Sequence, residues 1–242
     1  MLEGSDSLNA VLFVQPSLGQ QPDAADVWPM LFDGEKPDAF QRTPGMPLPV
    51  TTASGQRDGA NVQITAQVGR IDLVWTRSPI DETGRPGQFA DISGAINIAA
   101  SALGRLTDGI EPARLGLAIN TSSKIGNADP AAALSSLLER VYFPPTASDA
   151  IYRVNLQRDL PGMEEAKLNR LSTWLTGAHQ MFSLNPGTPF PVVMETISYM
   201  AHNVDVNTIG QLTFDRMKPR DLIDVIKTEA IEVLSQGLRF YG

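Results

Sequence analysis

The sequence predicts an α+β fold in which a mostly antiparallel sheet is covered by helices. A nineteen-residue stretch at 190–208, FPVVMETISYMAHNVDVNT, has no Gly and no Pro after Pro191, and it is rich in β-branched and aromatic residues. An amphipathic helix pattern follows at 218–238. Two strand patterns at 62–67 and 70–76 flank Val68-Gly69, which is typical of a hairpin. We expect a single domain over residues 1–242.

The chain begins with a strand pattern and then loses regularity. Residues 8–15 read LNAVLFVQ and end at Pro16, as a short buried strand does. Between residues 16 and 58, prolines and glycines oppose long helices and strands, so we expect a Pro-rich arm. This arm either packs on the body of the domain or docks a partner. Its candidate partner-binding residues are the apolar side chains Trp28, Met30, Leu31, Phe32 and Phe40.

The later elements follow from hydrophobic spacing. Apolar residues recur every three or four positions from Phe89 to Leu106, which predicts a helix ended by Gly109 and Pro112. A second helix follows the Asp129-Pro130 cap, with its apolar stripe at Leu134, Leu137, Leu138 and Val141. Strand patterns cover 114–120 and 150–157, whereas 167–182 fits either a strand or a helix. We expect Trp75 and Trp174 to be buried, since both lie in apolar strand patterns.

The long stretch at 190–208 reads as one strand, or as two strands joined at a bulge. Alternation places His202 on the same face as Val204 and Val206, which is the better core face. Asp205 and Asn207 then share the opposite face. His202 and Asp205 therefore point apart, and we expect them not to form a joint metal site.

Composition removes several classes of function. The formal net charge of -8 and only 19 Lys and Arg among 242 residues disfavour a nucleic-acid surface. The absence of Cys removes disulfides, thiolate nucleophiles and thiolate metal sites. No basic region precedes an apolar run near the N-terminus, and no apolar run has the length of a membrane span. We therefore expect a cytoplasmic protein that binds neither nucleic acid nor membrane.

Candidate chemistry is sparse. The segment 121–129, TSSKIGNAD, lies between a predicted strand and the N-terminus of a predicted helix. In other proteins, backbone amides at such a position bind anions. The candidate ligand-binding residues of this segment are Ser122, Ser123, Lys124 and Gly126, although the spacing of a phosphate loop is missing. We interpret His179 as structural, and we predict no catalytic residue, cofactor or metal site.

Four short segments carry a resemblance. The strand LGLAIN (115–120), the segments RVNLQR (153–158) and LNRLSTW (168–174), and VDVNT (204–208) before the last helix occur in this order. In this respect the chain resembles a group of bacterial proteins of sporadic genome distribution and about 250 residues, which carries no established activity. The resemblance implies a strand at 167–182 and two similar halves, each of three strands followed by a helix.

Two functions fit these observations. The leading hypothesis is a non-enzymatic interaction or assembly component that binds a protein partner or a second copy of itself through an apolar surface. Such a component is expected beside a toxin, defence or phage gene. The alternative is an enzyme or a small-ligand or anion-binding protein that uses the loop at 121–129. A stable protein partner would favour the first function, and a bound small molecule would favour the second.

Overall fold

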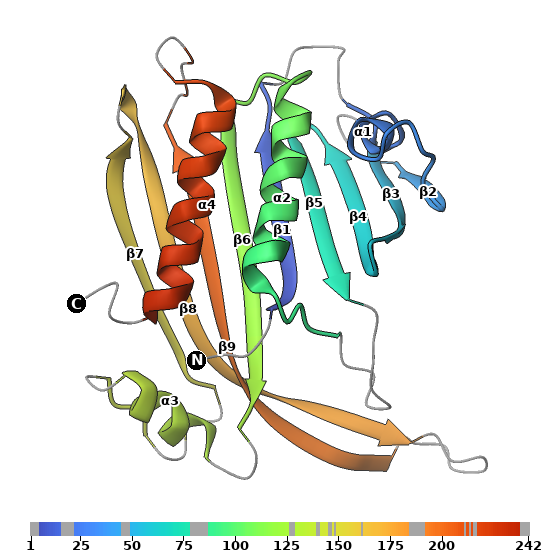
Figure 1. Ribbon diagram of the computed structural model, residues 1–242. Helices are drawn as coiled ribbons and strands as arrows, with labels where there is room; N and C mark the ends of the chain where they lie inside the picture. The colour runs from blue at the N-terminus through green and yellow to red at the C-terminus, as the bar shows by residue number, and fades with distance from the viewer. Residues whose placement is uncertain are drawn as a thin grey trace.

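The computed structural model describes residues 5–15, 22–44, 49–77, 87–125, 129–138, 141–144, 147, 149–160, 162–183, 192–210, 212, 214 and 217–237. Within these residues the chain forms nine strands and four helices (Figure 1). In chain order they are β1 (Ser5–Phe13), α1 (Ala24–Leu31), β2 (Ala39–Thr43), β3 (Val50–Arg57), β4 (Ala60–Gln67), β5 (Arg70–Arg77), α2 (Ile92–Thr107), β6 (Arg114–Lys124), α3 (Pro130–Leu138), β7 (Ile151–Leu160), β8 (Met163–Ser183), β9 (Val192–Ile209) and α4 (Pro219–Gln236).

All nine strands belong to one antiparallel sheet with the order β2-β3-β4-β5-β1-β6-β9-β8-β7. Strands β2 to β5 pair in sequence order, and β1 then pairs with β5 on one side and with β6 on the other. The first strand of the chain therefore lies at the middle of the sheet. Strands β2 and β7 lie at its two edges (Figure 1).

Strands β8 and β9 extend beyond their neighbours. Strand β7 pairs with β8 as far as Leu175, and β6 pairs with β9 from Tyr199 onward. Further along, 178–183 and 192–198 pair with each other as a two-stranded ribbon that leaves the end of the sheet (Figure 1). Of the two alternatives for 190–208, one strand or two joined at a bulge, the described residues form one continuous strand, β9, whose pairing with β8 has a register shift at Met181/Phe182. Phe190 and Pro191 lie outside the described residues. The strand implied at 167–182 is confirmed as part of β8.

This sheet contradicts the predicted fold class. In place of an α+β arrangement with two similar halves of three strands and a helix, the described chain is a largely β-sheet fold with some helices. The prediction was wrong because residues 39–57 were taken as an irregular arm, whereas most of them form β2 and β3. In addition, β1 joins the strands that precede α2 to those that follow it, so no halves form separate sheets.

Helices α2 and α4 lie side by side across one face of the sheet (Figure 1). In the strands between the two edges, alternate residues face the helices and most of these are buried, while the residues between them face the other way. Burying this apolar surface is the main favourable term for the fold. Trp75 and Trp174 are 5% and 6% exposed, which confirms the prediction that both are buried. The helix-facing core includes Leu8, Leu12, Ile64, Leu73, Leu117, Ile119, Val204, Val206, Ile96, Leu103, Ile226 and Val233.

The Pro-rich arm contains a short helix that packs into this core. Asp23 begins α1, because its carboxylate accepts a hydrogen bond from the Ala25 amide at 2.9 Å. Pro29 lies within the helix, and the helix ends two residues later. Trp28 is fully buried against the sheet and lies 4.5 Å from the ring of Phe32 between centroids. At least this part of the arm belongs to the interior of the domain.

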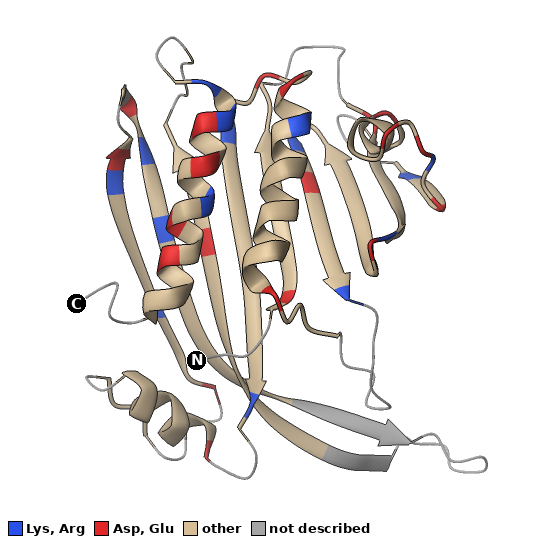
Figure 2. Ribbon diagram, in the orientation of Figure 1, with Lys and Arg blue, Asp and Glu red and all other residues tan. Residues whose placement is uncertain are grey.

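A buried carboxylate ties α4 to the edge of the sheet. Glu229 is a buried residue of α4, and its two oxygens lie 2.5 Å from Arg158 on β7 and 3.3 Å from Arg170 on β8. A carboxylate out of water is costly unless positive charges and hydrogen bonds compensate it. The two arginines supply both, so Glu229 fixes the position of α4 over two neighbouring strands. Figure 2 shows that charges of both signs follow α4 along its length.

Truncation of Trp28 tests whether the arm is part of the core. Trp28 is 0% exposed and Phe40 is 47% exposed. We expect Trp28→Ala to lower the free energy of unfolding by about 3–5 kcal/mol, the cost of deleting a buried aromatic side chain. Phe40→Ala is the matched control from the same arm, with an expected change within about 0.5 kcal/mol. Urea unfolding of both variants measures this, and equal stabilities would contradict it.

Replacement of Glu229 tests the contact between α4 and the sheet edge. Glu229→Gln keeps the volume but removes the charge that Arg158 and Arg170 share. We expect the free energy of unfolding to fall by about 1–3 kcal/mol, the cost of leaving a buried polar group unsatisfied. The loss is limited to this range because Arg158 is partly exposed and water can hydrate it. Glu232→Gln, on the same helix, alters a carboxylate that accepts a hydrogen bond from Gln236 and should leave stability unchanged. Thermal and urea unfolding compare the two variants, and a Glu229→Gln protein as stable as the control would contradict the role of this carboxylate.

Candidate functional site

The face of the sheet opposite the helices carries polar side chains. On β9, Val204 and Val206 face the helices, so Asp205 and Asn207 face the open side. The same alternation places Asn169 of β8 and Asn155 of β7 on this side, because Arg170 and Arg158 reach toward α4. The described helices all contact the other face. We call this second face the open face.

Hydrogen bonds join the amide side chains of the open face across three strands. Asn155 and Gln157 on β7 donate to Asn169 Oδ1 at 3.2 and 2.9 Å. Asn169 Nδ2 donates to Asn207 Oδ1 at 3.1 Å, and Asn207 Nδ2 donates to Asp205 Oδ1 at 2.8 Å. We call Asn155, Gln157, Asn169 and Asn207 the amide row. Each of these side chains donates its N–H in the direction of Asp205, so the row is a fixed arrangement of donors and acceptors across β7, β8 and β9.

A hollow of about 570 Å³ lies along this amide row. On β6, Gly116 is paired with Asn207 and adds no side chain. A Cβ atom at Gly116 would lie 3.0 Å from the Cβ atom of Asn207, so a larger residue there would require Asn207 to shift by a few tenths of an ångström. The hollow is lined by Arg114, Arg153, Asn155, Asn169, Leu171, Asp205 and Asn207.

Two arginines flank the hollow with different surroundings. Arg114 is held in place, since its Nε donates to the Thr208 carbonyl at 2.8 Å and its guanidinium lies 4.9 Å from the Phe13 ring centroid. Arg153 on β7 is exposed, and within the described chain it forms no ion pair. With Asp205 as the acidic group, the lining carries one net positive charge in a protein whose net charge is -8. The hollow therefore suits a polar group with negative charge and hydrogen-bonding capacity.

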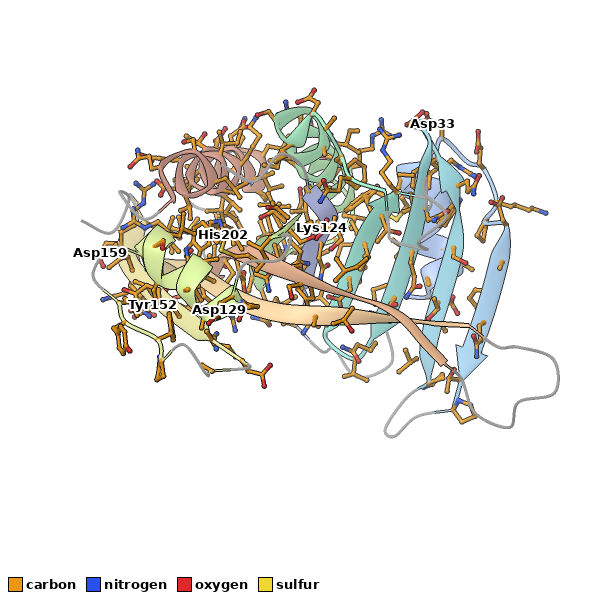
Figure 3. All side chains as sticks on the ribbon, turned by 90° about the horizontal axis from the view of Figure 1, so that it is seen from below. Asp33, Lys124, Asp129, Tyr152, Asp159 and His202 are labelled. Atoms are coloured by element: carbon orange, nitrogen blue, oxygen red, sulfur yellow. The ribbon has the colours of Figure 1, made fainter. Side chains whose placement is uncertain are left out.

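A second cluster of interest lies on the helix side, where α3 contacts β8 and β9 (Figure 3). Ser172 Oγ and His202 Nε2 lie 2.6 Å apart, and the His202 ring stacks on Trp174 with centroids 3.6 Å apart and an angle of 5°. Thr121 donates its hydroxyl to the His202 carbonyl at 2.9 Å. Trp174 also belongs to a small apolar cluster with Leu134 and Leu138 of α3.

Burial determines the chemistry of this histidine. Loss of hydration lowers the pKa of His202 from 6.5 to about 3, so the ring is neutral at physiological pH. The distance to Ser172 fits a serine paired with a general base. However, Ser172 and His202 are 1% and 2% exposed, so no substrate reaches the hydroxyl in this conformation. The pair is a structural hydrogen bond between β8 and β9.

The five predicted partner-binding residues have different environments. Trp28 and Leu31 are buried inside the chain, and Phe32 packs partly buried against the same core. Met30 and Phe40 are exposed at 39% and 47%. In this structure the arm thus presents two of the five side chains to a partner. Partner binding through the arm stays a prediction.

The predicted ligand segment at 121–129 divides between a strand and a helix cap. Ser122, Ser123 and Lys124 lie in β6 and pair with β9, and Gly126 lies outside the described residues. Asp129 begins α3 as predicted, because its Oδ1 accepts hydrogen bonds from the amides of Ala131 and Ala132 at 2.9 and 3.4 Å. These two amides at the helix N-terminus are already satisfied by the chain itself. An anion site in this segment stays a prediction.

His202 and Asp205 lie on opposite faces of β9, as the alternation predicted. Among the described residues, no group of three His, Asp or Glu side chains is placed to hold a metal ion. His179 lies in the ribbon part of β8. In the described part of the chain, no helix is both long and apolar enough to cross a membrane.

The residues of the hollow were not predicted as a site. Their alternation along each strand was visible, but the pairing of β7, β8 and β9 that brings them together was not. The segments that carry the bacterial resemblance converge here, since Asn155, Asn169 and Asn207 come from RVNLQR, LNRLSTW and VDVNT, and Gly116 comes from LGLAIN. This recurrence of Asn at open-face positions was the available signal.

Comparison with known proteins gives little. No family model matches the chain, and no curated protein matches it. Among solved structures, it is similar to the outer membrane protein AlkL, determined by solid-state NMR in DMPC lipid bilayers, at 9% sequence identity over 88% of this chain and 93% of that chain. The TM-score of 0.18 is too low for this likeness to bear on the fold.

The buried histidine predicts an acid-dependent loss of stability. Because the pKa of His202 is about 3 in the folded state and 6.5 in the unfolded state, only the unfolded state binds the proton between these values. Stability from this group is therefore complete above pH 6.5 and falls as the pH falls. We expect the fall in the free energy of unfolding from pH 7.5 to pH 5 to be larger in the wild type than in His202→Gln by roughly 2 kcal/mol.

Urea unfolding at the two pH values measures this difference. Carboxylates that titrate in acid contribute equally to both proteins, so the comparison isolates His202. The same pH dependence in the wild type and in His202→Gln would show that the ring titrates normally in the folded state.

Proposed function

We propose that this protein is a non-enzymatic interaction or assembly component that binds another polypeptide on the open face of its sheet. The single observation that carries the proposal is the hollow of about 570 Å³, which is lined from four neighbouring strands and contains a row of hydrogen-bonded amide side chains across three of them. A rigid, preorganised surface loses little conformational entropy on binding.

The chemistry of the lining favours a polypeptide over a small molecule. Small-molecule sites are mostly apolar and bury most of the ligand surface. Here Leu171 is the apolar member of a lining of seven residues, and the others are amides or charged groups. Amide side chains donate to and accept from the peptide groups of a polypeptide. The rest of the open face supplies the larger area that a protein interface needs.

The buried Ser172–His202 pair supports a non-enzymatic role. It is the arrangement in the described chain that is nearest to a nucleophile with its base, yet the core covers both side chains. The polar groups that do face solvent, around Asn169, bind one another in a continuous row. Such a row positions a bound partner and provides no activated nucleophile.

A quantitative capture experiment with a matched control tests the proposal. The tagged wild type, the double variant Asn155→Ala/Asn169→Ala and the control Gln63→Ala are incubated with lysate of the organism of origin. Gln63 is an exposed residue of β4 outside the hollow. We expect the wild type and the control to retain the same stoichiometric protein, and the double variant to retain about tenfold less, since it loses two or more hydrogen bonds of about 1 kcal/mol each.

Two results would contradict the proposal. One is equal retention of the partner by the double variant and the wild type, after circular dichroism has shown that both are folded. The other is a small molecule, found by native mass spectrometry, that stays with the wild type and the control but not with the double variant. The second result would favour the alternative of a small-ligand binding protein.

A further inference from the structure

Among the described residues, no strand pairs with the outer edge of β7. Strand β7 is the last strand in the sheet order and pairs with β8 on its inner side. Most of its side chains are exposed, including two large apolar ones, Ile151 at 64% and Leu156 at 36%. Asp159 lies at the outer margin of the molecule (Figure 3). An exposed edge of ten residues is a ready template for pairing with another strand.

We infer that β7 pairs antiparallel with β7 of a second copy of the chain, with Leu156 opposite Leu156 at the two-fold axis. Residues that lie opposite each other across an antiparallel pair point to the same face of the sheet. The open face of one copy must therefore continue into the open face of the other. The open-face residues of β7 have odd numbers, so an odd-numbered residue must lie opposite an odd-numbered residue of the second copy. The two residue numbers then add to an even number in every allowed register.

Charge complementarity selects one of these registers. When Leu156 lies on the axis, Arg153 faces Asp159 of the second copy, and the symmetry repeats this pair. In the same register Asn155 faces Gln157. When Asn155 lies on the axis instead, Arg153 faces Gln157 and Asp159 faces Ile151, so neither charge finds an opposite charge. Among the registers that pair most of Ile151–Leu160 with its own copy, the register about Leu156 forms two ion pairs and places an apolar pair at the centre.

The charged groups of this register are available. Arg153 forms no ion pair within the described chain. Asp159 lies 3.6 Å from Lys167, but both side chains are largely exposed, and such a pair contributes little. Arg158, in contrast, is committed to Glu229 on the helix side. The pairing thus uses the charges that the monomer leaves in solvent.

This pairing extends the amide row. Asn155 and Gln157 form its outer end, where they donate to Asn169. In the dimer Asn155 and Gln157 lie opposite Gln157 and Asn155 of the second copy. The amide rows of the two copies therefore meet at the two-fold axis and connect the two hollows. The result is one sheet of twice nine strands whose open faces form a single surface. The inference concerns the oligomer and does not depend on whether a further polypeptide binds in the hollow.

Single-cysteine variants test the contact and its register, because the chain has no Cys of its own. Leu156→Cys places two thiols directly opposite each other, within the Cα distance that a disulfide needs. Ile151→Cys is the control on the same strand, since its two copies would lie about 33 Å apart. We expect diamide to convert Leu156→Cys to a covalent dimer in high yield and Ile151→Cys only slightly.

Charge exchange in the full chain provides an independent measurement. By sedimentation, we expect the wild type to dimerise with rising concentration, Arg153→Asp to weaken dimerisation about tenfold, and Arg153→Asp/Asp159→Arg to restore it. Gln41→Asp on the opposite edge strand, β2, should have no effect. A wild type that stays monomeric, an Arg153→Asp variant that dimerises normally, or faster crosslinking of Asn155→Cys than of Leu156→Cys would overturn the inference.

Discussion

The structure depends on the burial of one face of a nine-stranded sheet beneath helices. Alternate residues of the strands are apolar on this face, and α2 and α4 remove them from water. Each helix provides one apolar stripe, and α4 adds Glu229 to hold the arginines of the outer strands. Because the helices cover one face only, the second face has to remain compatible with water.

The open face meets this requirement with amides more than with charges. Isolated charged side chains on a sheet are mobile and strongly hydrated, whereas Asn and Gln at neighbouring positions satisfy one another. The face is therefore polar and also ordered. A surface with these two properties is compatible with water without a covering layer and keeps a defined shape. The two faces of β9 show the contrast within one strand, with a neutral buried histidine on one side and Asp205 on the other.

Local patterns predicted the elements better than their arrangement. The stripes of α2 and α4 and the alternation in β9 are properties of continuous segments, so they could be found in the sequence. The pairing of Asn155, Asn169 and Asn207 joins segments far apart in the chain, and no local pattern identifies a neighbouring strand. The candidate site was missed for this reason.

The arm was misjudged for a different reason. Because the arm is rich in proline, we did not interpret Asp58-Gly59 as a hairpin turn, although this dipeptide is typical of one. In the structure both residues have positive φ and join β3 to β4. Trp28 likewise stands beside Pro29, and a proline is expected to interrupt a helix. Helix α1 is short enough to tolerate it, and the tryptophan reaches the core.

The central place of β1 has a consequence for biosynthesis. Among the described strands, β1 is synthesised before the others and acquires β5 as a neighbour from residue 70 onward, but its other neighbour, β6, begins at residue 114. At a usual translation rate, roughly 5–20 s separate the synthesis of β1 from that of β6. During this interval the N-terminal five strands exist as a partial sheet with an apolar, unpaired edge at what will become the middle of the protein. The order of synthesis thus makes the nascent chain most vulnerable to aggregation at its future centre.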